Sequence, residues 1–274
     1  MSDPMNIFQL RDVSFKYETV AAIDGVSLDI QAGKRVALLG ANGSGKSTLL
    51  RLLDALSFPA AGSISFQGQP LSEDRFADDQ FAFDFHRRVG LVFQNPDVQL
   101  FNPTVFDEVA FGPLQLRWSK SEIVERVKAV LDSMEIAHLK DRPPHRLSGG
   151  EKKRVALASV LVLDPEVLLL DEPTGALDPR SQSQIIDLLI GWGEGNKTVI
   201  TATHDLGLVE DIADHCVILQ AGKVAADGNP AALLADHALL QRANLVHAHR
   251  HRHGAEITHS HPHTHPHKHG SETI

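Results

Sequence analysis

The segment Gly40-Ala41-Asn42-Gly43-Ser44-Gly45-Lys46-Ser47 matches the spacing G-x-x-x-x-G-K-[ST] of a phosphate-binding loop. It follows a strand-like run, Val36–Leu39, and precedes a helical run, Thr48–Leu56, as such a loop requires. Glycines let the backbone wrap around phosphates, so that N–H groups and the helix amino terminus face negative charge. We predict that nucleotide phosphates contact Gly40, Asn42, Gly43, Ser44, Gly45, Lys46, Ser47 and Thr48.

A second group of polar residues follows the apolar run Val167–Leu170, which ends in Asp171 and Glu172. Carboxylates at a strand end lie at the carboxyl edge of a parallel sheet, where ligands bind in such folds. We expect Lys46 to reach the β and γ phosphates, while Ser47 and Asp171 hold Mg²⁺. Glu172 is the candidate general base, which accepts a proton from the attacking water or orients it. The alternative is a pair of solvated loop acids.

The elements that must position these residues follow from the hydrophobic pattern. Residues 1–35 alternate apolar and polar side chains and predict a small antiparallel β layer. Residues 36–240 alternate short apolar runs with helical patterns, which predicts a mostly parallel sheet with crossover helices, an α/β fold. Ser119–Met134 is predicted as an amphipathic helix with a capping box from Ser119 to Glu122. Its apolar residues are expected to share one face: Ile123, Val124, Val127, Val130, Leu131 and Met134. The predicted core strands are Val36–Leu39, Leu91–Phe93, Val167–Leu170, Val199–Ala202 and Cys216–Leu219.

The amino-acid composition narrows the function class. The chain has 274 residues, of which 42% are apolar, and its formal net charge is −9. This charge argues against nucleic acid as the main partner, because duplex binding depends on clustered lysine and arginine. The start of the chain has no signal-peptide pattern, and no apolar run is long enough to span a bilayer. Cys216, the only cysteine, is expected to be a buried, inert thiol.

The segment Leu147-Ser148-Gly149-Gly150-Glu151 lies just upstream of the strand that ends in the two carboxylates. Together with the two motifs above, it resembles the nucleotide-binding domain of ATP-binding cassette (ABC) proteins over residues 7 to about 240. The resemblance implies an ATP hydrolase fold with a phosphate-loop core sheet, an antiparallel β layer and a helical subdomain. It also implies a second ATPase subunit, most simply another copy, whose ATP is capped by Ser148, Gly149 and Gly150. A plain N-capped helix start is the alternative.

Four further positions match the family. Tyr17 corresponds to the aromatic residue that stacks on adenine, although a strand-surface aromatic is the alternative. Gln94 corresponds to the glutamine that contacts Mg²⁺ and the attacking water. Asp178 corresponds to a loop residue that touches the opposite subunit, and before Pro179 it also suits a helix N-cap. His204 corresponds to the histidine that contacts the γ-phosphate and holds Glu172. The resemblance thus implies Glu172, His204, Gln94 and Lys46 as the catalytic residues.

The segment from Val89 to Pro113 narrows the resemblance to the ATPase subunits of energy-coupling-factor importers, which take up vitamins and transition-metal ions. These ATPases work at the cytoplasmic face of the membrane with a membrane coupling subunit and a substrate-capture subunit. The resemblance implies apolar contacts to the coupling subunit from Phe101, Phe106 and Phe111. It implies Asp97, Asp107 and Glu108 as acceptors for basic residues of that subunit.

The end of the chain, residues 241–274, is dominated by histidine and is predicted to be a disordered tail beside the domain of residues 1–240. Imidazole suits nickel and cobalt ions, so the tail favours import of cobalt or nickel. A functionless solvated tail is the alternative for this segment. For the whole chain, the alternatives are a vitamin importer, a soluble ABC-type ATPase and a metallochaperone NTPase. The candidate metal ligands are His247, His249, His251, His253, His259, His261, His263, His265, His267 and His269.

Overall fold

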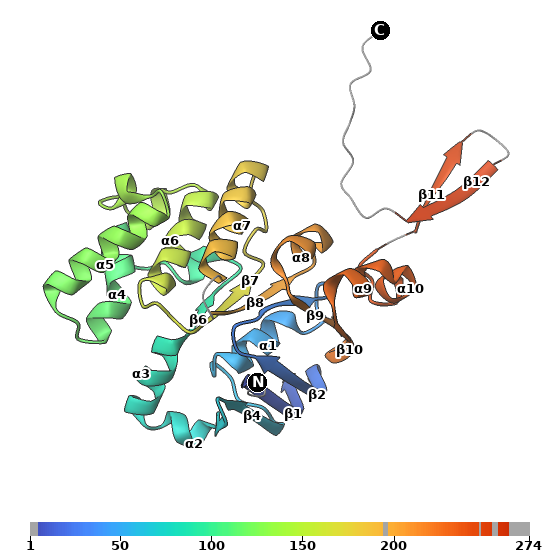
Figure 1. Cartoon of the computed structure of the whole chain (residues 1–274), viewed down its shortest axis with the longest axis horizontal. Coiled ribbons are helices and arrows are strands. Elements are labelled where there is room, and N and C mark those ends of the chain that lie inside the picture. Colours follow the sequence, from blue (N-terminus) through green and yellow to red (C-terminus); the bar gives the residue numbers. More distant parts are fainter. Residues whose placement is uncertain (1–4, 194–196, 247, 254–256, 263–274) are drawn as a thin grey trace, which may run out of the picture.

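The chain folds around a six-stranded sheet with the order β10-β9-β3-β8-β7-β6 (Figure 1). The computed structural model describes residues 5–193, 197–246, 248–253 and 257–262. Neighbouring strands are parallel except β10, which runs antiparallel to β9. The strands are β3 (Arg35–Leu39), β6 (Val89–Val92), β7 (Val167–Asp171), β8 (Thr198–Thr203), β9 (His215–Gln220) and β10 (Lys223–Gly228). All five predicted core strands are present, each displaced by at most two residues.

A second, antiparallel sheet has the order β2-β1-β4-β5 and confirms the predicted β layer. Buried residues alternate along the second half of β2 because one face of this sheet covers the core and the other faces solvent. The layer extends beyond the predicted residues 1–35, since its last two strands come after the phosphate loop. Its strands are β1 (Asn6–Tyr17), β2 (Val20–Gln31), β4 (Ala61–Phe66) and β5 (Gln69–Pro70).

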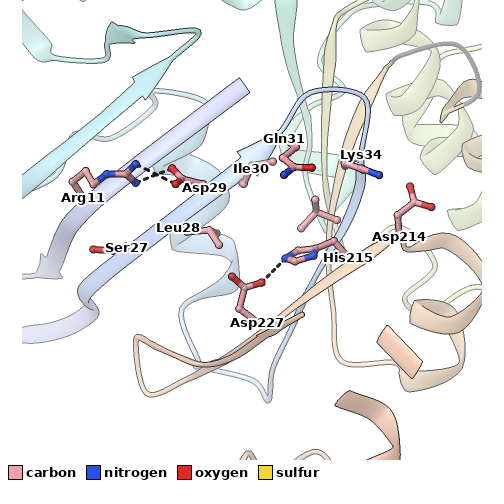
Figure 2. A pocket seen from close by; sticks show the side chains of 11 residues that line it. Arg11, Ser27, Leu28, Asp29, Ile30, Gln31, Lys34, Asp214, His215 and Asp227 are labelled. Carbon is pink, nitrogen blue, oxygen red and sulfur yellow. Dashed lines mark hydrogen bonds and ion pairs between the residues drawn. The ribbon is translucent and has the colours of Figure 1, made fainter. Parts of the chain in front are cut away.

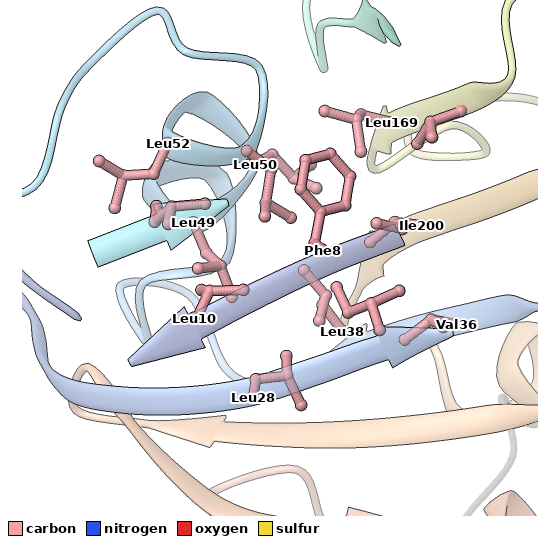
Figure 3. Packing of buried hydrophobic residues seen from close by; sticks show 14 of the residues in the cluster. Phe8, Leu10, Leu28, Val36, Leu38, Leu49, Leu50, Leu52, Leu169 and Ile200 are labelled. Carbon is pink, nitrogen blue, oxygen red and sulfur yellow. The ribbon is translucent and has the colours of Figure 1, made fainter. Parts of the chain in front are cut away.

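Helix α1 (Lys46–Leu53) packs against both sheets and fixes the position of the phosphate loop. Its leucines, Leu49, Leu50 and Leu52, meet Phe8 and Leu10 of β1 in one buried cluster (Figure 3). Burying one such side chain contributes about 1.5–3 kcal/mol. The helix is therefore held along its buried face by residues that come from both ends of the sequence. The same cluster includes Leu28, Val36, Leu38, Leu169 and Ile200.

A helical subdomain lies at one end of the molecule, away from the antiparallel sheet (Figure 1). It consists of α4 (Val105–Gln115), α5 (Lys120–Ser133) and α6 (Gly149–Leu161), which share a second core with β7. A third core packs β3 and β9 against the carboxyl-terminal helices. Cys216 is buried in this core, as predicted, and burial raises the pKa of its thiol to about 12. The remaining helices are α2 (Glu73–Phe76), α3 (Asp79–Arg88), α7 (Pro179–Gly193), α8 (Leu206–Ile212), α9 (Pro230–Ala235) and α10 (His237–Arg242).

Helix α5 confirms the predicted amphipathic helix with one correction. Ile123, Val127 and Leu131 are buried, but Val124, which we assigned to the same face, is 54% exposed. Successive helical residues differ by 100°, so the residue after Ile123 points away from the narrow stripe that α4 and α6 cover. The Ser119 hydroxyl accepts a hydrogen bond from the Glu122 N–H at 3.3 Å, one of the two bonds of the predicted capping box.

The tail differs from the prediction in the part that the structure describes. β11 (Ala248–His253) and β12 (Ile257–Pro262) pair in a separate antiparallel sheet, where we predicted no secondary structure. Histidine at every second position has the period of a β-strand, which explains the pairing. The other predicted tail ligands, His247, His263, His265, His267 and His269, lie outside the described residues. Within the described ranges, no helix is both long and apolar enough to cross a membrane.

Gly90 allows close contact between β6 and the end of α6. A Cβ atom built on Gly90 would lie 2.3 Å from Cγ1 of Val160. Because a β-branched side chain on a helix is stiff, Val160 cannot easily move aside. We therefore expect Gly90→Ala to lower the free energy of unfolding by about 1–3 kcal/mol, measured by urea denaturation.

Gly191 in α7 is the matched control, because an added Cβ there meets nothing within 4 Å. Gly191→Ala should raise the free energy of unfolding by about 0.5–1 kcal/mol, since alanine suits a helix better than glycine. Equal effects of the two substitutions would show that the contact between Gly90 and Val160 imposes no steric limit.

Candidate active site

The phosphate loop connects the carboxyl end of β3 to α1. Two of its positions require glycine because neighbouring atoms lie too close for a side chain. A Cβ on Gly40 would lie 2.4 Å from Ser44 Oγ and 2.6 Å from the carbonyl oxygen of Leu219. Gly45 has a φ of 108°, a left-handed value that L side chains rarely adopt, and a Cβ there would lie 2.5 Å from the Ala22 carbonyl oxygen. The loop is therefore pressed against neighbouring backbone at both ends.

Lys46 lies buried inside this loop. Its ammonium donates hydrogen bonds to the carbonyl oxygens of Gly40 at 2.7 Å and Ala41 at 3.3 Å. Burial lowers the pKa of Lys46, while the charges of Glu172 and Asp171 oppose this shift. A buried cation held mainly by carbonyl groups can exchange these partners for phosphate oxygens, which form stronger charge-assisted bonds.

Asp171 ends β7 next to the loop and offers an oxygen to a cation. Burial raises the pKa of its carboxyl group, and a hydrogen bond with the Ser47 side chain acts in the opposite direction. Its Oδ1 atom is buried without a hydrogen-bond partner. A hydroxyl and a carboxylate form an oxygen-only donor set, and the unpaired oxygen can be satisfied by a hard cation. These two residues therefore fit Mg²⁺.

Glu172 is held through its backbone and its side chain. Oε1 lies 2.8 Å from His204 Nδ1 and 3.7 Å from Lys46 Nζ, and Oε2 accepts a bond from the Thr203 hydroxyl at 3.4 Å. Its φ of 46° is unusual for a residue with a side chain. The backbone N–H donates to the Ala202 carbonyl oxygen at 2.9 Å, which keeps this strained turn in place. The structure thus brings together three of the four predicted catalytic residues.

Gln94 joins the same site across a cavity of about 500 Å³. Glu172 and His204 line this cavity together with Gln94 and Gly149. The cavity therefore connects the segment after β6, the Glu172 carboxylate and the start of α6. It is wide enough to admit water beside Glu172.

Ser148 caps the amino end of α6. Its hydroxyl accepts the Glu151 N–H at 3.4 Å, and the Glu151 carboxylate accepts the Ser148 N–H at 2.7 Å. The Ser148 hydroxyl also donates to this carboxylate at 2.8 Å. The bond from the Ser148 N–H and, second, the bond from its hydroxyl lower the pKa of Glu151. The N-capped helix start, which we gave as the alternative, is present. It does not require a glycine at this position, because a Cβ built on Gly149 would meet none of the described atoms within 4 Å. The chain's own packing leaves this position open to another molecule.

Two predicted residues lie on the surface around this site. Tyr17 is 45% exposed near the turn between β1 and β2, and its ring meets Phe15 edge-on at 5.0 Å. Asp178 accepts hydrogen bonds from the Ser181 N–H at 3.1 Å and the Ser181 hydroxyl at 2.6 Å, as expected for an N-cap of α7. Both side chains remain accessible to a ligand or a second subunit.

The predicted contacts to a membrane subunit need two corrections. Glu108 is 3% exposed and accepts the N–H groups of Phe101 at 2.8 Å and Asn102 at 2.7 Å, so it serves the fold. Phe106 packs against the core of the helical subdomain. Residue type alone did not distinguish these inward-facing positions from their neighbours. Phe101 and Phe111, by contrast, are exposed and meet each other edge-on at 5.1 Å.

Lys153 was not predicted. It is 2% exposed in α6, and its ammonium donates to the carbonyl oxygens of Gln94 at 2.7 Å and Glu172 at 2.9 Å. A signal for it exists in the sequence, because Lys153 lies three and four residues from the buried Ala156 and the site residue Gly149 on the same helix. A lysine on that face needs polar partners inside the protein.

A hollow of about 570 Å³ lies elsewhere, at the amino ends of β3 and β9 (Figure 2). It is opposite the carboxyl end of β3, from which the phosphate loop starts. Arg11 pairs with Asp29 at 2.8 Å, and His215 pairs with Asp227, as expected for a histidine with a structural role. These two pairs hold β1 to β2 and β9 to β10. None of the predicted site residues is among the described residues that line this hollow.

Comparison with known proteins supports the same assignment. Residues 23–175 match the ABC transporter family. Over 242 residues the chain is 60% identical to a nickel import ATP-binding protein, NikO, of Rhodobacter capsulatus, covering 87% of this chain and 95% of that protein. It is 40% identical to an energy-coupling factor transporter ATP-binding protein, EcfA, of Methanocaldococcus jannaschii, covering 88% and 85%.

Solved structures agree with the fold. CbiO1 of Clostridium perfringens, described as part of an ABC transporter complex, matches with a TM-score of 0.74 and 37% identity, covering 88% of this chain and 95% of that one. A dimeric ATP-binding cassette, MJ0796, bound to ADP and phosphate, matches with a TM-score of 0.73 and 28% identity, covering 81% and 98%. The fold class and the resemblance derived from the sequence are both confirmed. The chain belongs to the ABC transporter family and is an ATP-hydrolysing transport subunit.

Proposed function

We propose that this chain is the ATPase of an energy-coupling-factor importer for nickel or cobalt. The position of Glu172 supports the proposed ATP hydrolysis. Its Oε1 atom lies 2.8 Å from His204 Nδ1 and 3.7 Å from Nζ of Lys46, which lies inside the phosphate loop. The similarity to NikO, a nickel import ATP-binding protein, supports the metal substrate. Vitamin import by the same architecture is the nearest alternative. A soluble ABC-type ATPase is the next, and the exposed apolar surface described below argues against it.

In the proposed reaction, different site residues bind phosphate, hold Mg²⁺ and accept the proton of the attacking water. Lys46 and the loop N–H groups bind the phosphates of ATP, and Ser47, Asp171 and Gln94 hold Mg²⁺. When bound, Mg²⁺ neutralises phosphate charge and orients the phosphates. Glu172 takes up the proton of the attacking water at its carboxylate, or orients that water. His204 fixes this carboxylate from the other side and faces the γ-phosphate.

The proposed assembly is a pair of ATPase subunits with two ATP molecules between them. Gly149 supports this, because it is exposed and no contact with the residues that the structure describes requires a glycine there. In the assembly, Ser148, Gly149 and Gly150 cap the ATP of the partner, and Asp178 touches that partner. Tyr17 stacks on adenine. The similar cassette MJ0796 is a dimer, which supports the pairing.

The proposed docking surface for the membrane coupling subunit consists of Phe101, Phe111 and Leu114, all exposed. Phe111 and Leu114 lie three residues apart on α4, so they share one face. A groove of about 720 Å³ continues this surface, because Leu114 lines it opposite Phe83 and Asp84 of α3. Asp97 lies exposed on the segment between β6 and α4 and is paired with Lys152 at 2.7 Å, a bond that a basic partner residue can replace. An amphipathic helix with basic ends fits such a groove.

This docking places the chain at the cytoplasmic face of the membrane, as a peripheral subunit beside the coupling and substrate-capture subunits. We further propose the division into a cassette, residues 1–240, and a tail, residues 241–274. Because Ala243 and Val246 are buried in the third core, a truncation that spares the fold must come after Val246. Residues 247–269 of the tail are proposed to bind Ni²⁺ or Co²⁺ through their histidines and to be dispensable for ATP hydrolysis.

Glu172→Gln removes the proton acceptor but keeps the shape of the side chain. Hydrolysis should fall by at least ~10², because general-base assistance contributes 10²–10⁴. ATP binding should remain, and the ATP-bound dimer should live longer. Phosphate release and gel filtration with ATP measure these effects. Glu210→Gln, an exposed site on α8, is the control. Turnover near that of the wild type would remove Glu172 from the mechanism.

Phe101→Ala combined with Phe111→Ala tests the docking surface. Loss of two aromatic anchors, at 1 kcal/mol or more each, should weaken association with co-expressed membrane subunits about 30-fold. ATP binding should be unchanged. Val124→Ala, an exposed position on α5, serves as the matched control, and co-purification measures the effect. Undiminished association of the double variant would place docking elsewhere.

A chain that ends at Val246 tests the tail. It should keep its ATPase activity, because every proposed nucleotide contact precedes residue 247. It should lose the Ni²⁺ and Co²⁺ binding that full-length protein shows in calorimetric titrations, with Zn²⁺ titrated for comparison. Neutral imidazole is the ligand, so affinity of the full chain should fall as the pH drops through roughly 6.5. If both chains bind metal equally, the tail is not the site.

A further inference from the structure

Lys153 connects three motifs that lie far apart in the sequence. It belongs to α6, the helix that begins with Ser148 and Gly149. Its ammonium donates one bond to the carbonyl oxygen of Gln94, in the segment after β6, and one to that of Glu172, after β7. One side chain therefore holds the first turns of α6 to both segments that approach the γ-phosphate in the proposed function.

Because the Lys153 ammonium is buried, its stability depends on where α6 lies relative to the groups around it. Burial lowers the pKa of Lys153, and the negative charges of Asp171 and Glu172 oppose that shift. A buried charge is tolerated only when hydrogen bonds and nearby counter-charges compensate the lost water. The groups that compensate the Lys153 charge lie after β6 and at the carboxyl end of β7. A shift of α6 that stretched the hydrogen bonds of Lys153 would therefore cost free energy.

Helix α6 is stiff enough to transmit such a shift. The capping box fixes its first turn, and Val155, Ala156 and Leu157 are buried in the helical core. Lys153 follows Gly149 by four residues, which is about one helical turn or ~6 Å along the axis. A displacement of Gly149 when it meets ATP therefore moves the Lys153 backbone by a similar amount.

The carbonyl oxygen that accepts a hydrogen bond from Lys153 belongs to the strained residue Glu172. Its φ of 46° is held by three bonds to its backbone: its N–H donates to Ala202, and its carbonyl oxygen accepts from Lys153 and from the Gly175 N–H at 3.1 Å. Because the side chain leaves from the same Cα atom, the direction of the carboxylate depends on these bonds. Loss of the Lys153 bond leaves only the Gly175 N–H on the carbonyl, so Glu172 could relax out of the left-handed region and away from His204.

We propose that Lys153 is a positioning residue that sets the orientation of Glu172 and Gln94 according to the position of α6. The proposal rests on the proposed roles of Glu172 and Ser148–Gly150. It gives each subunit a direct link between the segment that caps the partner's ATP and the carboxylate that acts on its own ATP. Hydrolysis in one site then depends on whether the other site is occupied.

The test compares Lys153→Met with Lys153→Gln. Both side chains are one bond shorter than lysine. Methionine fills a similar volume but donates no hydrogen bond, whereas glutamine carries two N–H donors. In Lys153→Met, kcat for ATP should fall about 10- to 100-fold, the effect of losing hydrogen bonds to a charged donor. The dissociation constant for ATP and the KM should stay within about twofold, since Lys153 touches no loop residue that binds phosphate.

Lys153→Gln should recover most of the lost kcat, and Lys128→Met, an exposed lysine on α5, should leave kcat unchanged. Circular dichroism and thermal unfolding of each variant report the fold. The proposal is overturned if Lys153→Met keeps its kcat, if kcat and ATP affinity fall together, or if Lys153→Gln is no better than Lys153→Met. Glu172→Gln separates this failure from that of the proposed function, because active Glu172→Gln would contradict the function itself.

Discussion

The position of one carboxylate, that of Glu172, depends on nearly every other feature of the structure. Its side chain lies between a buried ammonium, Lys46, and an imidazole, His204. Its backbone adopts a conformation that costs about 1–3 kcal/mol and persists only because neighbouring groups fix it. β8 supplies the Ala202 carbonyl and the Thr203 hydroxyl, and α6 supplies Lys153. The reactive group is thus held by elements from both subdomains.

The two sheets make this arrangement possible by fixing α1. The helix begins at Lys46, the residue proposed to reach the phosphates. Its leucines are enclosed by β1, β2 and β4 on one side and by the central sheet on the other. A helix anchored along its buried face cannot rotate without opening cavities, which cost about 2–5 kcal/mol for each large side chain removed from contact. The antiparallel layer, which carries Tyr17 at its edge, therefore also determines where the phosphate loop lies.

The sequence predicted those features that depend on local spacing. The loop from Gly40 to Ser47, the carboxylates after β7 and the helix start at Ser148 are contiguous segments, and each was predicted by residue type and order. The contact between the distant residues His204 and Glu172 was expected only because the family resemblance implied it. Contacts between distant segments that the resemblance did not supply were not predicted. Lys153 shows this, because its partners at Gln94 and Glu172 are 59 and 19 residues away. Glu108 shows the converse, since a glutamate in a predicted contact segment folds inward to satisfy two N–H groups.

The distribution of buried and exposed groups also explains why one chain cannot complete the proposed reaction alone. Lys46, Asp171, Glu172 and Lys153 are all buried, which places charges of both signs in a region of low dielectric where their mutual distances matter strongly. Ser148 and Gly149 are exposed, and their backbone and hydroxyl dipoles face solvent. Such dipoles stabilise an anion well only when water is excluded around them. A second subunit that covers Gly149 would exclude this water, and α6 connects that event to the buried charges through Lys153.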